Sequence, residues 1–413
     1  MTSPRMLFVS TASSYRNHAF IRAAQTLDMQ WLLLCDSTVP ADYANNSMVY
    51  NPRAYATMIA TIIDLHHQQP FVACMALDDS GAHIAQQIAV DLALPHNSTT
   101  ATEAARNKHA MRLALQTTTI PLPWFRCFVS SDDIAMITAT VPYPCVIKPL
   151  ELNGSRGVMR ADTPAQLVIA HARLLRMLAT LYPNSQEYEF LIESFIPGNE
   201  VALEAMMDNG VLIPLALFDK PDPLDGPFFE ETIYVTPSRL PESTQQAIYA
   251  ITQTAALAIG LVNGPVHAEL RINSTGIYIV EIAGRSIGGL CSQTLRFGSD
   301  ESLEMLIVRQ ASGLLTATPT RRHEAGGVMM IPIPTSGILQ QVHGIETALA
   351  VPLIESIEIT SPLYQPIITL PEGESYLGFI FARGQSPATV EQALRDAHAL
   401  LRIQIIPDIQ LIS

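Results

Sequence analysis

The sequence predicts an α/β protein with a parallel sheet near its N-terminus and a mixed, largely antiparallel α+β piece at its C-terminus. In the first hundred residues, short apolar runs at 6–9, 31–35 and 71–76 alternate with helical stretches at 18–28, 53–67 and 80–92. That alternation is typical of βαβ units around a parallel sheet. Beyond about residue 313, short strands rich in Ile and Val precede a helix at 388–401. The length of 413 residues predicts more than one hydrophobic core.

The composition argues against several classes of protein. Hydrophobic residues make up 48% of the chain and charged residues 15%, which argues against global disorder. A net charge of -14 disfavours nucleic acid or an anionic membrane as partner, although a local basic pocket for a phosphate remains compatible with it. No apolar run approaches the roughly 20 residues of a membrane helix, and the first ten residues lack a secretory h-region.

The spacing of the five cysteines leads us to expect a cytoplasmic protein. They stand far apart, with no Cys-x-x-Cys pair and an odd total, at positions 35, 74, 127, 145 and 291. Neither a zinc site nor a disulfide framework follows from this spacing.

The middle of the chain predicts helices and strands in a definite order. A helix over 103–116 carries Lys108 and Arg112 on one face, and the Thr-Thr-Thr-Ile-Pro that follows it places a boundary near 120. The later elements are strands at 124–129, 145–148 and 190–195, helices at 131–139 and 163–181, and an irregular loop at 221–227.

A candidate ligand loop lies in the N-terminal region, at Asp78-Asp79-Ser80-Gly81. Open parallel sheets bind ligands beyond the carboxyl ends of their strands, and this loop follows the third apolar run. The same residues form an ordinary helix N-cap. Both interpretations stay open, with the cap favoured.

Two glutamates are predicted to face each other in a β-hairpin. Residues 266–271 and 277–281 alternate polar and apolar positions, and Ser274-Thr275-Gly276 fits a three-residue loop with glycine in the left-handed position. This register places Glu269 opposite Glu281, with Cβ atoms about 5 Å apart. Facing carboxylates repel unless a cation or a shared proton compensates, and magnesium takes carboxylate oxygens together with substrate phosphates. A solvated hairpin whose register slips by one residue is the alternative.

Arg285 follows the second strand and favours the interpretation as a site. A guanidinium there would hold a substrate carboxylate or stabilise an oxyanion near the metal. The next residues, Ser286-Ile287-Gly288-Gly289, allow a ligand to approach the backbone closely. An arginine at a strand end is also often an ordinary surface charge.

A second group of residues suits a nucleotide. The strand ending at Lys148 leads into Asn153-Gly154-Ser155-Arg156-Gly157-Val158, where backbone N–H groups and a hydroxyl can meet phosphate oxygens. This is not a Walker A sequence, and a plain hairpin turn with an exposed lysine is the alternative. Between Leu191 and Glu200, backbone groups can read an adenine edge and a carboxylate can bind ribose hydroxyls. Each of these features is also normal in a strand and turn.

Taken in chain order, the motifs resemble the ATP-grasp superfamily. The order runs through Lys108, Ile147-Lys148-Pro149, Gly154 to Val158, Ile192 to Glu200, His267-Ala268-Glu269 and Glu281-Ile282-Ala283-Gly284-Arg285. The resemblance spans about 100–312, follows a Rossmann-like βαβ domain, and is strongest to the L-amino-acid ligases, or dipeptide synthetases. The C-terminal hundred residues match only in general character.

The resemblance implies roles for individual residues. Lys108 and Lys148 would grip the ATP phosphates, beneath a lid loop formed by Ser155, Arg156, Gly157 and Val158. Adenine would be read by Glu193, Ser194, Phe195 and Ile196, with Glu200 on the ribose. Glu269 and Glu281 would hold Mg²⁺, for which Mn²⁺ is a possible substitute, while Arg285 would face the acyl phosphate with Lys148 as the second catalytic residue. The candidate substrate contacts are Glu231, His267, Ser286, Gly288 and Gly289.

One departure from the family pattern concerns the metal. Many ATP-grasp enzymes have Glu-x-Asn at the second metal position, whereas Glu281-Ile282-Ala283 offers alanine and so one protein ligand fewer. The expected domains are a Rossmann-like domain at 1–105, a linker helix and lid subdomain at 106–192, a catalytic subdomain with the metal site at 193–312, and a C-terminal subdomain at 313–413.

The activity that the resemblance implies is that of an ATP-dependent carboxylate–amine ligase. ATP would phosphorylate the carboxylate of one amino acid, and the amine of a second would displace the phosphate to give a dipeptide. Two alternatives stay open, a biotin-carboxylase-like enzyme and a non-catalytic ATP-binding protein. The chain has no Met-Lys-Met biotin-attachment motif. Amino acids are the expected partners, and a homodimer is compatible with these expectations.

Overall fold

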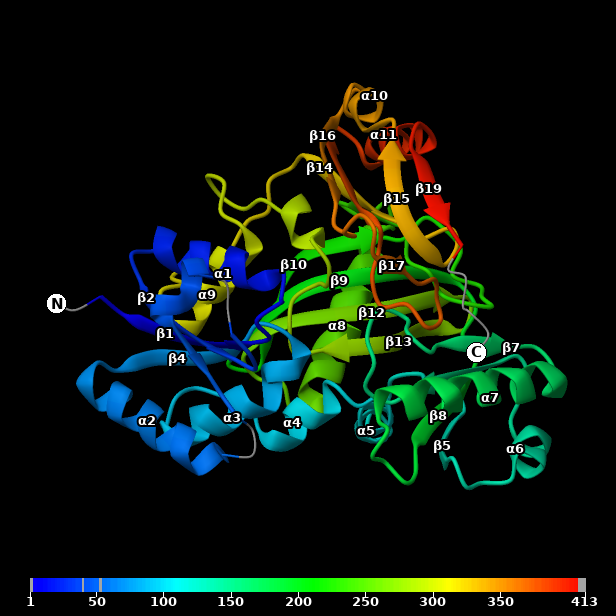
Figure 1. Ribbon diagram of the computed structural model, residues 1–413, viewed down its shortest axis with the longest axis horizontal. Helices are drawn as coiled ribbons and strands as arrows, with labels where there is room; N and C mark the ends of the chain where they lie inside the picture. The colour runs from blue at the N-terminus through cyan, green and yellow to red at the C-terminus, as the bar shows by residue number, and fades with distance from the viewer. Residues whose placement is uncertain (1–2, 39–40, 52–53, 408–413) are drawn as a thin grey trace.

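The computed structural model describes residues 3–38, 41–51 and 54–407, and Figure 1 shows how its elements are arranged. The N-terminal region contains the strands β1 (Arg5–Ser10), β2 (Gln30–Cys35), β3 (Ser47–Val49) and β4 (Phe71–Ala76), and the helices α1 (Arg16–Thr26), α2 (Tyr55–Gln68) and α3 (Ala82–Asp91). The strands form a parallel sheet in the order β3-β2-β1-β4. The predicted βαβ units are therefore confirmed. Residue 53, at the start of the expected second helix, lies outside the described residues.

The apolar run in β1 is continuous because this sheet is covered on both faces. Met6 and Phe8 are buried with side chains of α1. Leu7 and Val9 point to the opposite face and are buried with side chains of α2 and α3. A parallel strand covered on both sides reads as an unbroken hydrophobic segment rather than an alternating one.

The predicted helix at 103–116 is wrong in one respect, because the chain forms two shorter helices there. These are α4 (Thr99–Ala104) and α5 (Lys108–Leu115). The break falls at Asn107, whose side chain accepts hydrogen bonds from the backbone N–H groups of His109 and Ala110 at 3.0 and 3.1 Å. An asparagine N-cap of this kind begins a new helix. Lys108 and Arg112 share the buried face of α5, as expected.

A second, smaller sheet follows in the chain. Its strands are β5 (Phe125–Val129), β6 (Cys145–Pro149), β7 (Met159–Ala161) and β8 (Glu189–Ser194), in the order β5-β8-β6-β7. The helices that accompany it are α6 (Ile134–Thr140) and α7 (Pro164–Leu181). We call these elements the lid subdomain; they lie at the lower right of Figure 1. The predicted strands and helices of this region are confirmed to within a few residues.

An antiparallel sheet of eight strands forms the centre of the molecule, in the order β13-β12-β9-β10-β11-β14-β18-β16. Its strands are β9 (Asn199–Asp208), β10 (Val211–Asp219), β11 (Ile233–Thr236), β12 (Gly264–Asn273), β13 (Gly276–Ala283), β14 (Ala325–Ile331), β16 (Ile354–Ile359) and β18 (Gly378–Gly384). The helices of this half of the chain are α8 (Glu242–Ile259), α9 (Leu303–Ala311), α10 (Ile345–Leu349) and α11 (Pro387–Ala399).

The remaining elements are small. A three-stranded antiparallel sheet has the order β17-β15-β19 and consists of β17 (Pro366–Ile367), β15 (Gly337–His343) and β19 (Arg402–Ile406). The 3₁₀ helices are η1 (Ala41–Asn46), η3 (Asp79–Gly81) and η4 (Cys291–Thr294). Within the described part of the chain, no helix has the length and hydropathy needed to cross a membrane. The antiparallel character expected beyond residue 313 is confirmed.

The hairpin of β12 and β13 has the predicted pairing but reaches it in a different way. Glu269 lies opposite Glu281, as expected. The predicted three-residue loop is wrong, because Asn273 pairs with Gly276 across a two-residue turn. That turn alone would shift the register by one residue and move Glu281 to the other face. A bulge at Val280 restores the pairing, since one extra residue in a strand returns the following side chains to their original face.

Candidate functional site

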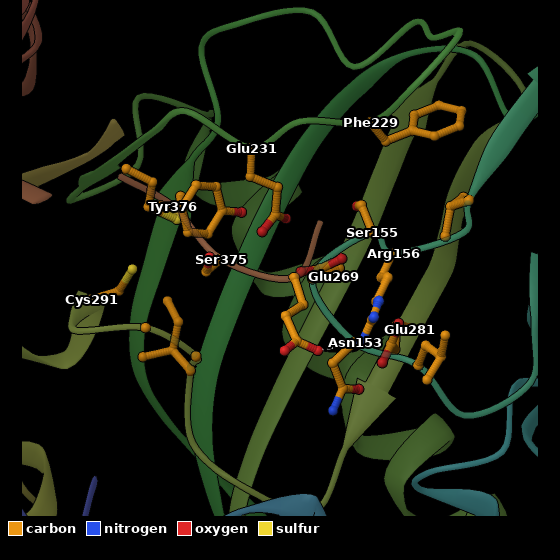
Figure 2. A pocket seen from close by; sticks show the side chains of 18 of the residues that line it. Asn153, Ser155, Arg156, Phe229, Glu231, Glu269, Glu281, Cys291, Ser375 and Tyr376 are labelled. Carbon is orange, nitrogen blue, oxygen red and sulfur yellow. Dashed lines mark hydrogen bonds and ion pairs between the residues drawn. The ribbon is translucent and has the colours of Figure 1, made fainter. Parts of the chain in front are cut away.

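One large cavity brings the predicted site residues together, and Figure 2 shows the carboxylates of Glu231, Glu269 and Glu281 inside it. Its volume is about 1180 Å³, more than the roughly 300–1,000 Å³ typical of a pocket for one drug-sized ligand. The predicted residues that line it are Lys108, Lys148, Ser155, Arg156, Val158, Glu193, Ser194, Phe195, Ile196, Glu200, Glu231, His267, Glu269, Glu281, Arg285, Gly288 and Gly289.

Two predicted residues stand just behind the wall. Gly157 has a positive φ of 74°, and a Cβ there would lie 2.5 Å from the Met177 side chain. It therefore supports the lid loop by packing closely. Ser286 is buried, and its hydroxyl accepts a hydrogen bond from Arg16 at 2.8 Å.

Lys108 and Lys148 form the positive side of the cavity. The Lys148 ammonium lies 2.5 Å from the carboxylate of Glu193. The Lys108 ammonium donates to the carbonyl of Leu152 at 2.8 Å and lies 3.2 Å from Glu281. Burial lowers the pKa of Lys148, and the positive charges of Arg112 and Lys108 lower it further. The negative charge of Glu193 acts in the opposite direction but does not outweigh them. A buried ammonium with too little negative charge around it is stabilised when an anion binds.

The Glu193 carboxylate belongs to this cationic group. It is 2% exposed and is paired with both Arg112 and Lys148. Burial alone would raise the pKa of Glu193, but the two cations outweigh burial and hold the pKa at about 2. Next to it, the cavity wall is apolar: Val146, Leu224 and Phe229 pack together with Val158 and Phe195. This end of the cavity suits a flat aromatic ring.

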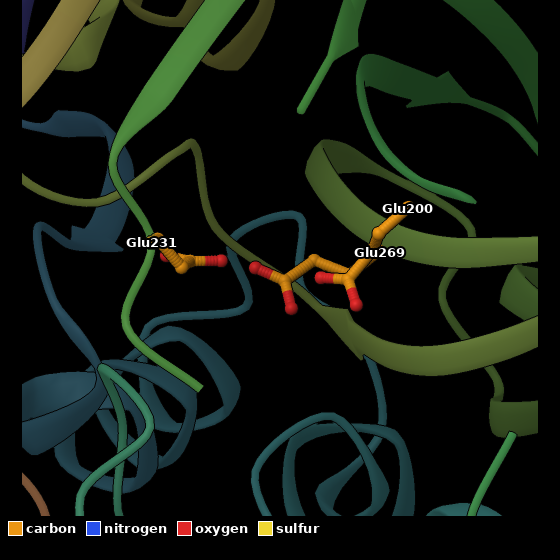
Figure 3. Close-up of side chains that lie close together, drawn as sticks. All are labelled: Glu200, Glu231 and Glu269. Carbon is orange, nitrogen blue, oxygen red and sulfur yellow. The ribbon is translucent and has the colours of Figure 1, made fainter. Parts of the chain in front are cut away.

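Three carboxylates that line the cavity lie close together, as Figure 3 shows for Glu200, Glu231 and Glu269. One oxygen of each lies within 4.8 Å of the others. The cation that these carboxylates share is the ammonium of Lys220, which lies 2.7 Å from Glu200, 3.3 Å from Glu269 and in contact with Glu231. Burial opposes its charge, but the carboxylates outweigh burial and raise the pKa of Lys220. An ammonium has three donors and can serve all three carboxylates, yet burial and the charge of Glu269 still raise the pKa of Glu231 to about 7.

His267 adds a second positive charge beside Glu269. Its Nδ1 lies 2.5 Å from Glu204 and its Nε2 lies 3.4 Å from Glu269. Burial would lower the pKa of His267, but the two carboxylates raise it to about 9. The imidazole is therefore protonated near neutral pH.

The donor set of Glu269 and Glu281 fits a hard divalent cation. The two side chains face each other across the hairpin and line the cavity, with 19% and 26% of their side-chain surface exposed. Carboxylate oxygens are the protein ligands that Mg²⁺ prefers, and these two open to a pocket that also holds Lys108 and Lys148. Mn²⁺ accepts the same ligands. Ala283, at the position where an asparagine would add a ligand, lies opposite His267.

Arg285 is fixed by the N-terminal region. Its Nε donates to Asp79 at 2.6 Å, and the same carboxylate accepts a hydrogen bond at 2.7 Å from Asn153, which precedes the lid loop. Burial would raise the pKa of Asp79, but Arg285 outweighs burial and lowers it. The cap interpretation is confirmed, because Asp78 caps η3 by accepting from the N–H of Ser80. Asp79 lines the cavity, and contact of this loop with a ligand stays a prediction.

The sequence did not single out Arg16, Arg112 and Lys220 as site residues. Arg16 donates to the carbonyls of Ser286 and Ile287 at 3.0 and 2.6 Å, and so holds the loop after Arg285. Arg112 pairs with one carboxylate and Lys220 with three, and these carboxylates come from distant segments of the chain. The sequence carries only weak signals for these roles. Arg112 stands out only because it shares a helix face with Lys108, and Arg16 belongs to no motif.

The lid subdomain also contacts the C-terminal segment at 371–374, a set of contacts that we call the lid latch. Arg173 of α7 forms a two-pronged pair with Glu372 at 2.6 and 2.7 Å. In the lid loop, Arg156 donates to the carbonyl of Glu372 at 3.0 Å and pairs with Glu374. The N–H of Gly157 donates to the carbonyl of Pro371 at 2.8 Å.

Comparisons with known proteins identify two domains and a similar fold. An ATP-grasp domain matches residues 141–294, and the L-amino acid ligase C-terminal domain 2 matches residues 329–405. In the crystal structure of an L-amino acid ligase from Bacillus licheniformis, the fold is similar with a TM-score of 0.83, at 23% identity and over 98% of this chain and 100% of that one.

Two curated relatives are matched over part of their length. An uncharacterised protein, y4rH, from Sinorhizobium fredii is 23% identical over 74% of this chain and 62% of its own length. An alanine–anticapsin ligase from Bacillus subtilis is 25% identical over 46% of this chain and 43% of its own. The chain thus spans less than two thirds of either relative. The chain therefore contains an ATP-grasp domain, followed by the C-terminal domain of the L-amino acid ligases.

Proposed function

We propose that this protein is an ATP-dependent ligase that joins the carboxylate of one amino acid to the amine of another. The observation that carries the proposal is the charge pattern of the cavity, in which two buried lysines, Lys108 and Lys148, share one cavity with the facing carboxylates of Glu269 and Glu281. Transfer of a phosphoryl group needs this combination, because catalysis there depends on positioning and on neutralising charge.

The nucleotide takes the positive end of the cavity. Lys108 and Lys148 bind phosphate oxygens, and the undercompensated charge of Lys148 favours an anion there. The adenine ring lies against the apolar wall of Phe195 and Phe229, whose rings are stacked at 6.3 Å. Glu200 is positioned for the ribose by its pairs with Lys220 and Arg271. Glu269 and Glu281 hold Mg²⁺ or Mn²⁺, which supplies positive charge at the transferring phosphoryl group.

Arg285 acts on the substrate side. Its pair with Asp79 fixes the direction of the guanidinium, and a second hydrogen bond to the carbonyl of Ser286 at 3.0 Å adds to this. A fixed guanidinium stabilises the negative charge that develops when an amine attacks an acyl phosphate. The lid loop from Ser155 to Val158 covers the site and excludes water, which would otherwise hydrolyse the acyl phosphate.

The test is phosphate release from Mg-ATP in mixtures of amino acids, followed together with product mass. We expect phosphate release that requires two amino acids and yields a dipeptide. Release that depends on bicarbonate and biotin instead would support a carboxylase. Binding of nucleotide without any turnover would identify a non-catalytic ATP-binding protein.

The lid latch leads to a prediction about charge reversal. Arg173→Glu should place two like charges together at Glu372 and loosen the lid subdomain. Because both side chains are more than a third exposed, the cost in stability should stay below about 1 kcal/mol. Limited proteolysis of the lid loop should nevertheless become several-fold faster. The double variant Arg173→Glu/Glu372→Arg restores the pair and should recover most of the protection; equal cleavage rates in all three proteins would contradict the latch.

A further inference from the structure

The cavity has a second apolar end, separate from the ring-binding wall. It is formed by six residues: Tyr234, Ile287, Cys291, Met330, Tyr376 and Phe379. All six belong to or pack against one hydrophobic cluster, whereas the wall near Phe195 and Phe229 belongs to another. In Figure 2, Tyr376 and Cys291 lie on the side of the pocket away from Phe229. We call this end the apolar recess.

The recess opens next to Glu231. The hydroxyl of Tyr234 donates to Glu231 at 2.8 Å, and Glu231 acts electrostatically on Cys291 and Tyr376. One residue of the recess, Ile287, follows Arg285 by two positions in the chain, and both residues line the cavity. It therefore lies on the substrate side of the cavity.

The walls of the recess carry no ionised group of their own among the six residues named. Burial raises the pKa of the Cys291 thiol, and burial followed by the charge of Glu231 raises the pKa of Tyr376 and of Tyr234. All three side chains are therefore neutral near pH 7. The adjacent carboxylate of Glu231 is already engaged by Lys220 and Tyr234. A charged side chain entering the recess would lose its water without gaining a free partner.

The recess is also firmly shaped. Gly289 has a φ of 59°, and a Cβ at that position would lie 2.9 Å from the Phe379 ring. The ring of Phe379 in turn packs edge-on against Tyr376 at 6.2 Å and stacks with Phe381 at 6.2 Å. A wall in which backbone and rings are in contact cannot readily enlarge, so it discriminates by size.

We propose that the apolar recess binds the neutral, hydrophobic side chain of one of the two amino-acid substrates. The proposal rests on the ligase function above and names the class of one substrate. Hydrophobic pockets distinguish side chains that differ by one methylene by about 10- to 200-fold. The values of kcat/KM for L-leucine and for L-alanine should therefore differ by at least about tenfold, and L-lysine and L-aspartate should be excluded.

The first experiment compares two substitutions at one half-buried position. Tyr376→Ala opens the recess and should lower kcat/KM for the preferred hydrophobic amino acid at least tenfold, while KM for ATP stays within about twofold. Tyr376→Phe keeps the wall and removes only the hydroxyl, so it should stay within about threefold of the unmodified protein. Equal effects of Tyr376→Ala on the amino acid and on ATP would overturn the proposal.

A second variant tests the size limit from the other direction. Tyr376→Trp narrows the recess and should lower the ratio of kcat/KM for L-leucine to that for L-alanine at least tenfold. An unchanged ratio in a folded variant would show that Tyr376 does not border the bound side chain.

Binding measurements separate this proposal from the ligase function. Calorimetry with L-leucine, L-alanine, L-lysine and L-aspartate, in the presence of Mg²⁺ and a non-hydrolysable ATP analogue, needs no turnover. Binding of a hydrophobic amino acid that Tyr376→Ala weakens tenfold, without any ligation, would support the recess and reject the ligase. Ligation that prefers L-lysine or L-aspartate would support the ligase and reject the recess.

Discussion

Glu281→Gln should reduce turnover by at least about 10²-fold, the effect typical of removing one electrostatic stabiliser of a transition state, and leave the fold intact. The amide has the size of the carboxylate but no charge for a divalent cation. The cost to stability should be below about 1 kcal/mol, because the side chain is a quarter exposed and its partner Lys108 keeps a hydrogen bond to Leu152 at 2.8 Å.

The measurement is the rate of phosphate release as a function of Mg²⁺ concentration, beside a thermal unfolding curve. The matched control is Glu189→Gln, the same substitution at an exposed position of β8, which should change neither quantity. Full activity of Glu281→Gln at every Mg²⁺ concentration would show that the metal is not held at this hairpin.

The hairpin also shows how far the sequence could lead. Alternation and a plausible turn were sufficient to pair Glu269 with Glu281, although the turn was one residue too long. At the compensating bulge, the carbonyls of Ile279 and Val280 accept hydrogen bonds at 2.9 and 3.2 Å from Arg112, which belongs to a helix far away in the chain. A local sequence pattern carries no information about such a long-range contact.

The same reason limits the prediction of the site. Motif residues that follow strands could be identified one by one, and most of them line the cavity. Lys220 could not be assigned a role, because the three carboxylates around it reach it from three segments that only the folded sheet brings together. Arg16 is separated by 270 residues from its partner Ser286. Residues that position others leave little trace in sequence when their partners are backbone carbonyls.

Glu193→Gln should lower the free energy of unfolding by about 3–5 kcal/mol, the usual cost of leaving a buried charge without its partner. The substitution removes the counter-charge of two cations at once. Arg112 is fully buried, and Lys148 is 5% exposed, so water cannot replace the carboxylate. Urea unfolding at pH 7 measures the effect, with Glu189→Gln on the same strand as the control, for which a change within about 0.5 kcal/mol is expected.

The pH dependence tests the cause of this loss. The pKa of Glu193 is about 2 in the folded protein against an ordinary value of 4.5, a difference that corresponds to about 3 kcal/mol. Because the folded pKa is the lower one, this stabilisation is present above about pH 4.5 and is lost as the pH falls toward 2. The stability gap between the unmodified protein and Glu193→Gln should therefore be constant from pH 7 to pH 5 and shrink below pH 4.5. A gap that stays constant down to pH 3 would mean that the loss comes from packing, since packing does not titrate with Glu193.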